Sequence, residues 1–229
     1  MNQNLTVIVP CYNEEKTIKQ LITRVLEQEV VREVIVINDA STDNSAQLIK
    51  QIQDKRVLYL ENSKNLGKGA SVKKGFDLAT SEYVLIQDAD LEYSPEEYPR
   101  LLKPLESGFA DAVFGSRFLT FESRRALYFW HRVGNKFLTL LSNMFTNIDL
   151  TDMETCYKVI RTDFAKRIDI KESRFGLEPE LTAKLAKMDA RIYEVAISYR
   201  GRTYLEGKKI TWKDGFSAIR CIIKYNLMK

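Results

Sequence analysis

Residues 83–93 read Tyr-Val-Leu-Ile-Gln-Asp-Ala-Asp-Leu-Glu-Tyr, an apolar run that ends abruptly in carboxylates. A short aliphatic run of this kind predicts a buried strand with Asp88 and Asp90 at its carboxyl end. Residues two apart in an extended segment point the same way, so Asp88, Asp90 and Glu92 can present oxygens to one point. Mg²⁺ and Mn²⁺ prefer such ligands, and Mg²⁺ usually binds one or two carboxylates plus substrate phosphates. The stretch therefore predicts a metal site formed by Asp88, Asp90 and Glu92, although a polar loop that merely ends a strand has the same pattern.

Strands alternate with helices on both sides of this stretch. The connections have helical length, which predicts an α/β fold with a doubly wound, mostly parallel, Rossmann-like sheet and helices on both faces. Ligands of such sheets bind at the carboxyl ends of the strands, where Asp39 follows the second strand. Further strands are expected at 155–161 and 192–199. The expected strands of the first half are 5–10, 33–37, 57–60, 84–86 and 112–115.

Two helix starts and one turn are readable locally. Asn13 is expected to cap a helix over residues 14–29. The run Ser-Pro-Glu-Glu at 94–97 is typical of a capping box with proline at the first helical position. Gly67 and Gly69 predict a tight turn before a helix rather than direct ligand contact, since neither a dinucleotide fingerprint nor a P-loop is present.

Composition narrows the class of protein. The 229 residues fit one α/β domain, alone or with a small appendage, and the net charge of +4 is too small to favour nucleic-acid binding. The three cysteines, Cys11, Cys156 and Cys221, lack metal-ligand spacing, which predicts reduced thiols in the cytoplasm. A single histidine, His131, excludes a multi-histidine zinc site. The sequence shows no signal peptide, and no apolar run approaches the ~18 residues that span a bilayer.

Two segments of the second half are amphipathic. Residues 124–145 and 212–228 carry aromatic and aliphatic residues at helical spacing, together with Lys and Arg. Such helices can lie in a membrane interface, with the apolar face among the acyl chains. The sequence therefore predicts a cytoplasmic protein lying peripherally on a membrane surface. Packing against the protein's own sheet, a second copy of the chain or a membrane partner subunit remains open.

Seven motifs in a fixed order carry a family resemblance. The chain resembles the GT-A domain of family 2 inverting glycosyltransferases, and in particular dolichyl-phosphate mannose synthases and bacterial polyprenyl-phosphate glycosyltransferases. It departs from the mannose synthases at 152–158, where they have a run ending Ser-Gly-Phe-Lys, and it carries only one helix after residue 212. The motifs are Val-Pro-Cys-Tyr-Asn-Glu at 9–14, Asn-Asp-Ala-Ser-Thr-Asp at 38–43, Asn-Leu-Gly-Lys-Gly at 65–69, Gln-Asp-Ala-Asp at 87–90, Gly-Ser-Arg at 115–117, Asp-Met-Glu-Thr-Cys-Tyr-Lys at 152–158 and Tyr-Arg-Gly-Arg at 199–202.

The resemblance implies that different parts of the chain bind the donor and the acceptor. Residues 1–211 would form the GT-A domain, with a nucleotide-sugar-binding half at 1–120 and an acceptor-binding half at 121–211. Residues 212–229 would form the C-terminal amphipathic helix. The implied nucleotide-sugar-binding residues are Pro10, Tyr12, Glu14, Asp39, Asp88, Ala89, Arg202 and Lys208, with Lys209 beside the last. The implied catalytic residues are Asp90, Arg117, Asp152 and Arg202, and the implied cofactor is Mg²⁺ or Mn²⁺ at Asp88, Asp90 and Glu92.

The predicted reaction moves a sugar from a nucleotide-sugar donor, UDP- or GDP-linked, to a polyprenyl phosphate. Arg117, with Arg132, would bind that phosphate, which is already ionised and needs no strong base. A hydroxyl acceptor in cell-surface polysaccharide synthesis is the alternative, and it needs a base, for which Asp152, Glu178 and Glu180 are candidates. A sugar-1-phosphate nucleotidyltransferase is disfavoured because no glycine-rich loop follows the first strand. A nucleotide-sugar-binding module without catalysis is the non-enzyme alternative.

Overall fold

A single mixed sheet forms the centre of the molecule in the computed structural model, which describes residues 3–119, 125–126, 128–174, 176–203 and 212–227. Within these residues, the strands are β1 (Leu5–Cys11), β2 (Val31–Asn38), β3 (Val57–Glu61), β4 (Tyr83–Ile86), β5 (Ala112–Ser116), β6 (Lys158–Arg161) and β7 (Ile192–Ala196). Their order across the sheet is β3-β2-β1-β4-β6-β5-β7. Only β6 runs antiparallel to its neighbours among these strands, so the predicted mostly parallel α/β sheet is confirmed.

The central strands read as continuous apolar runs because helices cover both faces of the sheet. In β1, Leu5, Val7, Ile8 and Val9 are completely buried, and β4 is buried along its whole length. Strands buried on both faces have no polar side to alternate with, which explains the Val- and Ile-rich sequence. Packing on both faces fixes where β4 ends, and this sets the positions of Asp88 and Asp90 just beyond it.

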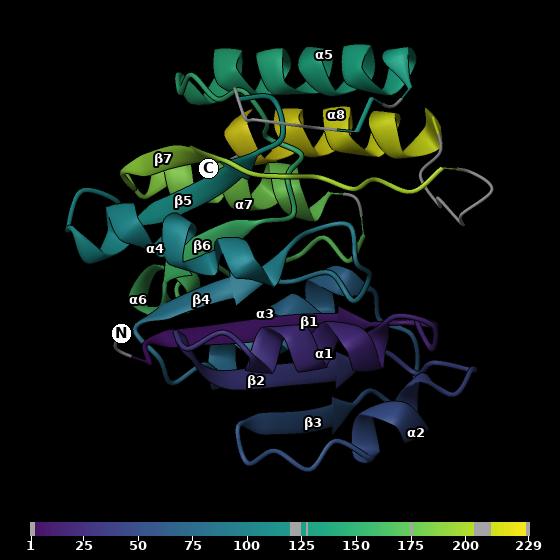
Figure 1. Ribbon diagram of the computed structural model, residues 1–229. Helices are drawn as coiled ribbons and strands as arrows, with labels where there is room; N and C mark the ends of the chain where they lie inside the picture. Colours follow the sequence, from purple (N-terminus) through teal and green to yellow (C-terminus); the bar gives the residue numbers. More distant parts are fainter. Residues whose placement is uncertain (1–2, 120–124, 127, 175, 204–211, 228–229) are drawn as a thin grey trace.

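The helices fall into two groups. The helices of the first half are α1 (Ile18–Leu26), α2 (Ser45–Lys50), α3 (Lys68–Leu78) and α4 (Tyr98–Glu106), the last preceded by the 3₁₀ turn η1 (Pro95–Glu97). The helices of the second half are α5 (Phe129–Thr146), α6 (Thr162–Ala165), α7 (Leu177–Lys187) and α8 (Trp212–Leu227). Helix α8 lies between α5 and α7, and α5 is the outermost element at the top of Figure 1. Among the described helices, none is long and apolar enough to cross a membrane.

The cap expected at Asn13 is wrong, whereas the helix start expected at 94–97 is confirmed, with Ser94 as the N-cap residue and Pro95 at the first helical position. The first helix begins at Ile18, and Asn13 instead accepts a bond from the backbone N–H of Thr42 at 2.8 Å. Ser94 makes no side-chain cap at η1. The Oε1 atom of Glu97, the other half of the expected box, accepts from the backbone N–H of Ser198 at 2.8 Å.

Two strands are shorter than expected for similar reasons. The carbonyls of Met153 and Thr155 turn inward to accept bonds from the buried Nζ of Lys158, so β6 begins only at Lys158. The segment after β7 leaves the sheet and pairs with the backbone of Glu92 through the N–H of Arg200 at 2.9 Å. That departure carries residues 199–202 toward the carboxyl end of β4.

Candidate active site

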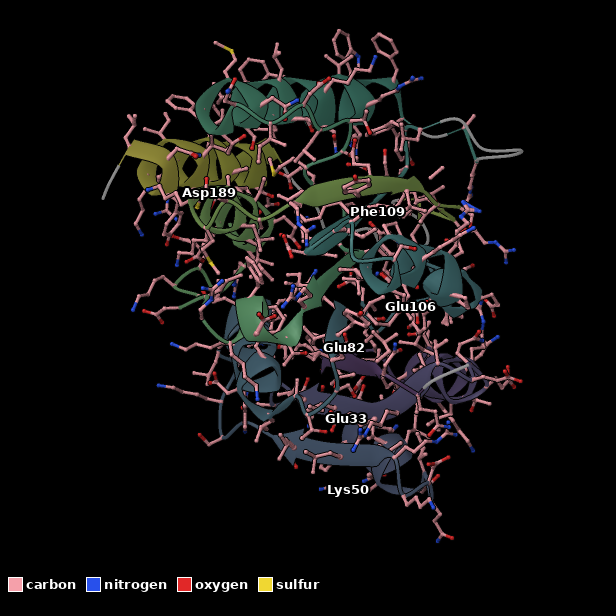
Figure 2. All side chains as sticks on the ribbon, turned by 90° about the vertical axis from the view of Figure 1, so that its left-hand side faces the viewer. Glu33, Lys50, Glu82, Glu106, Phe109 and Asp189 are labelled. Carbon is pink, nitrogen blue, oxygen red and sulfur yellow. The ribbon has the colours of Figure 1, made fainter. Side chains whose placement is uncertain are left out.

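The carboxyl ends of β2, β4 and β5 place charged side chains at one edge of the sheet. Asp39 follows β2, Asp88 and Asp90 follow β4, and Arg117 follows β5. Figure 2 views the opposite edge, where Glu33, Glu82 and Phe109 lie at the amino ends of strands. The concentration of acids and bases at the first edge is the arrangement that binds ligands in sheets of this kind.

Asp88 is paired with Lys68 from the start of α3. The Nζ atom of Lys68 lies 2.8 Å from Oδ1 of Asp88 and 3.0 Å from Oε1 of Glu178 at the start of α7. Burial would raise the pKa of Asp88, but the charge of Lys68 lowers it below its usual range. Burial likewise works against the charge of Lys68, yet Asp88 and Glu178 hold its pKa well above the usual value. The lysine therefore stays a cation between two carboxylates.

Asp90 is paired with Arg202. Nη2 of Arg202 lies 2.7 Å from Oδ2 of Asp90, and its Nη1 lies 3.5 Å from Oε2 of Glu14. Burial raises the pKa of Asp90 to about 7, and the nearby charges of Asp88 and Glu92 add to the effect of burial, against Arg202. One arginine thus does not fully neutralise this group of carboxylates, and a further cation would be favourable there.

Glu92 anchors the segment after β7. Its Oε1 accepts from the backbone N–H of Arg202 at 2.8 Å, and its Oε2 accepts from the hydroxyl of Tyr199 at 2.7 Å. The structure brings Asp90 and Glu92 together through Arg202, but the described residues include no group of three acids, cysteines or histidines arranged as a metal cage. A metal at this site would therefore be bound by one or two carboxylates together with oxygens of the substrate, as is usual for Mg²⁺.

Several predicted nucleotide-binding residues lie at the carboxyl ends of β1 and β2. Tyr12 is 42% exposed, whereas Asp39 is buried. The carboxylate of Asp39 accepts from the backbone N–H groups of Leu66 at 2.9 Å and Gly67 at 2.7 Å, and from the side chain of Asn62 at 2.9 Å. Asp39 therefore holds the loop before α3 whatever else it binds.

Two further residues predicted to bind the nucleotide-sugar lie beside the ends of β1 and β4. Pro10 lies in β1, half-buried at its carboxyl end. Ala89 is buried, and its carbonyl accepts from the hydroxyl of Thr17 at 2.9 Å. Lys208 and Lys209 lie outside the described residues.

Arg117 and Asp152 form a buried two-pronged ion pair. Nε and Nη2 of Arg117 lie 2.7 Å from Oδ2 and Oδ1 of Asp152, which is completely buried and also accepts from the backbone N–H of Arg117. Asn135 of α5 donates to the same carboxylate at 3.3 Å. The guanidinium of Arg117 lies 5.1 Å from the ring centroid of Tyr199. Such a fork fixes the orientation of the arginine, because both bonds must be aligned at once.

The three candidate bases are placed very differently. Asp152 is occupied by Arg117. Glu180 is completely buried and accepts from the backbone N–H groups of Lys171 and Glu172, besides an ion pair with Lys184 at 2.5 Å. Glu178 alone lies beside Lys68, within the same cluster as Asp88.

A model of glycosyl transferase family 2 matches residues 6–169. The chain belongs to this family. It is 28% identical over 213 residues to undecaprenyl-phosphate 4-deoxy-4-formamido-L-arabinose transferase of Proteus mirabilis, covering 89% of this chain and 62% of that protein. It is 25% identical over 232 residues to dolichol-phosphate mannosyltransferase of Pyrococcus furiosus, covering 98% of this chain and 64% of that protein. The chain thus spans just under two thirds of both relatives.

The fold is also that of a solved glycosyltransferase structure. Glucosyl-3-phosphoglycerate synthase of Mycobacterium tuberculosis, in complex with Mn²⁺, UDP and glucosyl-3-phosphoglycerate, superimposes with a TM-score of 0.73 at 18% identity. The match covers 98% of this chain and 80% of that one. The resemblance of this family 2 glycosyltransferase to a GT-A architecture is confirmed.

Sequence reasoning missed two residues of the site. The glycines on either side of Lys68 predict only a turn and give no sign of its ion pairs, and Sγ of Cys156 lies 3.3 Å from Nζ of Lys68. Gly67 precedes α3 with a φ of +89°, the left-handed region that favours glycine, and the absence of direct ligand contact stays a prediction. The sequence does carry one indication of Lys68, which is a single lysine at the start of a helix that follows a strand. A lysine in that position can lie near the carboxyl ends of the strands, where ligands bind.

Proposed function

We propose that this family 2 glycosyltransferase is metal-dependent and inverting, and transfers one sugar from a UDP- or GDP-linked donor to a polyprenyl phosphate. The observation that carries the proposal is the cluster at the end of β4, where Asp88 and Asp90 face Lys68 and Arg202. The two carboxylates could bind a metal ion, and the two cations could bind the diphosphate that the metal ion accompanies. The lipid-phosphate acceptors named for the two relatives give the acceptor class.

Asp88 and Asp90 would hold Mg²⁺ or Mn²⁺, and their chemistry fits either ion. The raised pKa of Asp90, about 7, marks a site with excess negative charge. Glu92 remains a predicted ligand, although both of its oxygens already have partners. When bound, the metal would stabilise charge on the departing nucleotide diphosphate. Arg202 would contribute to the same stabilisation from the segment after β7, and Lys208 is proposed to help.

The donor base and ribose would lie beside Tyr12, at the carboxyl end of β1. An exposed aromatic ring beside a strand end offers a flat apolar face for a base. Pro10, Glu14, Asp39 and Ala89 complete the proposed donor site. Asp39 would act largely through the loop it holds, because its oxygens already accept three bonds from residues 62–67.

Arg117 would bind the acceptor phosphate. The fork with Asp152 uses Nε and Nη2, and a guanidinium has five N–H donors in total. A phosphate monoester is mostly ionised at neutral pH, since its second pKa is near ~6, so it can attack without a strong base. Asp152 would then be a positioning residue for Arg117 rather than a base. Arg132 follows on α5, where its guanidinium lies 5.8 Å from the ring centroid of Phe118.

The outer side of α5 supports a membrane surface as partner. Trp130, Phe137, Leu140 and Met144 are spaced by three, four and seven residues and are each between 54% and 77% exposed. Figure 2 shows side chains projecting from α5 away from the rest of the molecule. The helix contains Arg132 and Lys136 but no acid, so its charge complements anionic lipid headgroups and would repel a second copy. A cytoplasmic membrane surface is therefore the proposed location.

One observation favours a hydroxyl acceptor as the second candidate. Glu178 lies in the site beside Lys68, and neighbouring Glu154 has a buried Oε1 without a hydrogen-bond partner among the described residues. Burial, followed by the charge of Glu178, raises the pKa of Glu154 to about 8. The carboxyl of Glu154, with its raised proton affinity, and the carboxylate of Glu178 beside Lys68 are the candidate acceptors of a hydroxyl proton.

A choice between acceptors tests the proposal. The assay supplies UDP- and GDP-linked sugars with Mn²⁺ to the full chain, using undecaprenyl phosphate and, as matched control, undecaprenol. Label entering the lipid phase only with the phosphate, and falling strongly in Arg117→Lys but little in Glu178→Gln, supports the lipid-phosphate reaction. Transfer to a hydroxyl acceptor that depends on Glu178 and ignores Arg117 would replace it with the second candidate.

A further inference from the structure

A short segment before α7, residues 171–174, lies between α8 and the loop that carries Lys68. The segment is far from both in sequence, and its side chains and carbonyls face different partners. Glu172 points toward α8, whereas its own carbonyl and that of Ser173 face the loop before α3. The segment therefore connects the last described helix to the candidate donor site.

Helix α8 holds Glu172 with three of its side chains. Nη2 of Arg220 lies 2.5 Å from Oε2 of Glu172, and Nζ of Lys224 lies 3.1 Å from Oε1. The hydroxyl of Tyr225 donates to the same Oε1 at 2.8 Å. The side chain of Glu172 is only 13% exposed. Burial would raise its pKa, but the bonds from Arg220, Tyr225 and Lys224 lower it to about 2.

Helix α7 holds the backbone of the same segment. Glu180 accepts from the N–H of Lys171 at 2.8 Å and from the N–H of Glu172 at 2.7 Å. A Cβ added at Gly176 would lie 2.5 Å from the sulfur of Cys221 in α8 and 2.9 Å from Cγ of Glu172. The segment is thus fixed from two helices and cannot shift without disturbing one of them.

The opposite side of the segment presses on the loop before α3. A Cβ at Gly67 would lie 2.2 Å from the carbonyl oxygen of Ser173, and one at Gly69 would lie 1.8 Å from the carbonyl oxygen of Glu172. The N–H of Gly69 donates to the carbonyl of Ser173 at 3.0 Å. Only glycine permits this approach, so the two segments must move together.

The loop bears groups of the proposed donor site. The N–H groups of Leu66 and Gly67 bind the carboxylate of Asp39, and Lys68 binds that of Asp88. We propose that α8, acting through Glu172, is a positioning element for this loop and hence for nucleotide binding. Arg220, Lys224 and Tyr225 would be positioning residues that touch neither donor nor metal. The inference rests on the proposed function for the identity of the ligand, but not for the link between α8 and the loop.

The test removes one clamp from α8 and follows the loop directly. Arg220→Ala leaves Glu180 in place, so the fold should persist. Arg24→Ala is the matched control, because Arg24 also makes an ion pair with a glutamate, Glu96, at 2.7 Å, but on α1. Hydrogen exchange of a peptide covering residues 66–70 reports the loop without any ligand. Calorimetry with UDP or GDP and Mn²⁺ reports nucleotide affinity of the full chain.

We expect Arg220→Ala to speed exchange in the 66–70 peptide and to weaken nucleotide binding about 3- to 10-fold, the range of such indirect coupling. Tyr225→Phe should act in the same direction by a smaller factor, and Arg24→Ala should change neither. Unchanged exchange in both Arg220→Ala and Tyr225→Phe would overturn the link. If exchange is faster in the variants but neither the wild type nor any variant binds UDP or GDP, the link between α8 and the loop stands and the proposed function is contradicted.

Discussion

Arg202 closes over Asp90, with Nη2 of the arginine 2.7 Å from Oδ2 of the aspartate. The arginine comes from the segment after β7 and the aspartate from the end of β4. The same guanidinium reaches Glu92 at 3.2 Å and Glu14 at 3.5 Å. It is therefore the cation around which the carboxylates of the site are arranged, and a diphosphate entering with a metal would compete with them for it.

Replacing Arg202 should impair the reaction more than the fold. Arg202→Ala leaves Asp90, Glu92 and Glu14 without their shared cation and removes a donor to the departing diphosphate. We expect kcat/KM to fall by about 100-fold or more, with partial recovery in Arg202→Lys. Steady-state kinetics and circular dichroism measure the two effects. Normal kcat/KM in a folded Arg202→Ala protein would exclude this role.

Tyr12 and Asp39 should both affect donor binding but differ in their effect on stability. Tyr12 is half-exposed, so Tyr12→Ala should raise the donor KM about 3- to 10-fold with little change in kcat, which is the pattern of uniform binding. Asp39→Asn should raise KM and also lower unfolding free energy by about 1–3 kcal/mol, because buried N–H groups lose an acceptor. Kinetics and urea unfolding are compared in parallel. An unchanged donor KM in both variants would remove these residues from the donor site.

Local patterns predicted the sheet and its functional edge well. The buried runs of β1, β2 and β4 have no other stable placement than a covered sheet, and the acids after them necessarily lie at its carboxyl edge. The antiparallel direction of β6 was not predictable from Lys-Val-Ile-Arg, because four β-branched and charged residues carry no directional signal.

Pairings across long separations were equally hidden. Arg117 and Asp152 are 35 residues apart, and Lys68 and Glu178 are 110 apart. Residue type alone made Asp152 a candidate base. Its ion pair with Arg117 instead makes it a residue that orients the arginine. The division into a domain at 1–211 and an appended helix remains a prediction, although α8 packs on α5 and α7 with Ala218, Cys221 and Ile222 buried.

The α5 face should bind anionic vesicles in a salt-sensitive manner. Trp130→Ser with Leu140→Ser removes exposed apolar surface and should reduce co-sedimentation about 10-fold or more, given the transfer energy of such side chains. Leu227→Ser, an equally exposed leucine in α8, is the matched control and should change it little. These substitutions are better than removing residues 212–229, because that truncation deletes α8 and would expose the surfaces of α5 and α7 that α8 covers. A full chain that stays in the supernatant at low salt would rule out membrane docking.

Asp111 should stabilise the fold at neutral pH and lose that effect in acid. Hydrogen bonds from Arg191, at 2.8 Å and 2.9 Å, lower its pKa to about 2, against burial. Because the pKa is lowered on folding, the stabilisation is present above the ordinary value of ~3.9 and is lost as pH falls toward 2. Asp111→Asn should therefore cost about 1–2 kcal/mol at pH 6, allowing for the half-exposed arginine, and about half as much at pH 3. Urea unfolding measures both, with exposed Asp163→Asn as control, and an equal cost at both pH values would contradict the assignment.

Sugar transfer to undecaprenyl phosphate by the wild type and by Asp90→Asn, each with Mn²⁺ and with excess chelator, tests the central claim most directly. Asp90→Asn keeps the size of the side chain and removes one charge at a site already crowded with carboxylates, so the fold should persist. We predict transfer only by the wild type with metal, and a loss of several kcal/mol of transition-state stabilisation, on the order of 1,000-fold in rate, in the variant. Near-normal transfer by folded Asp90→Asn, or full transfer by the wild type in chelator, would contradict the account.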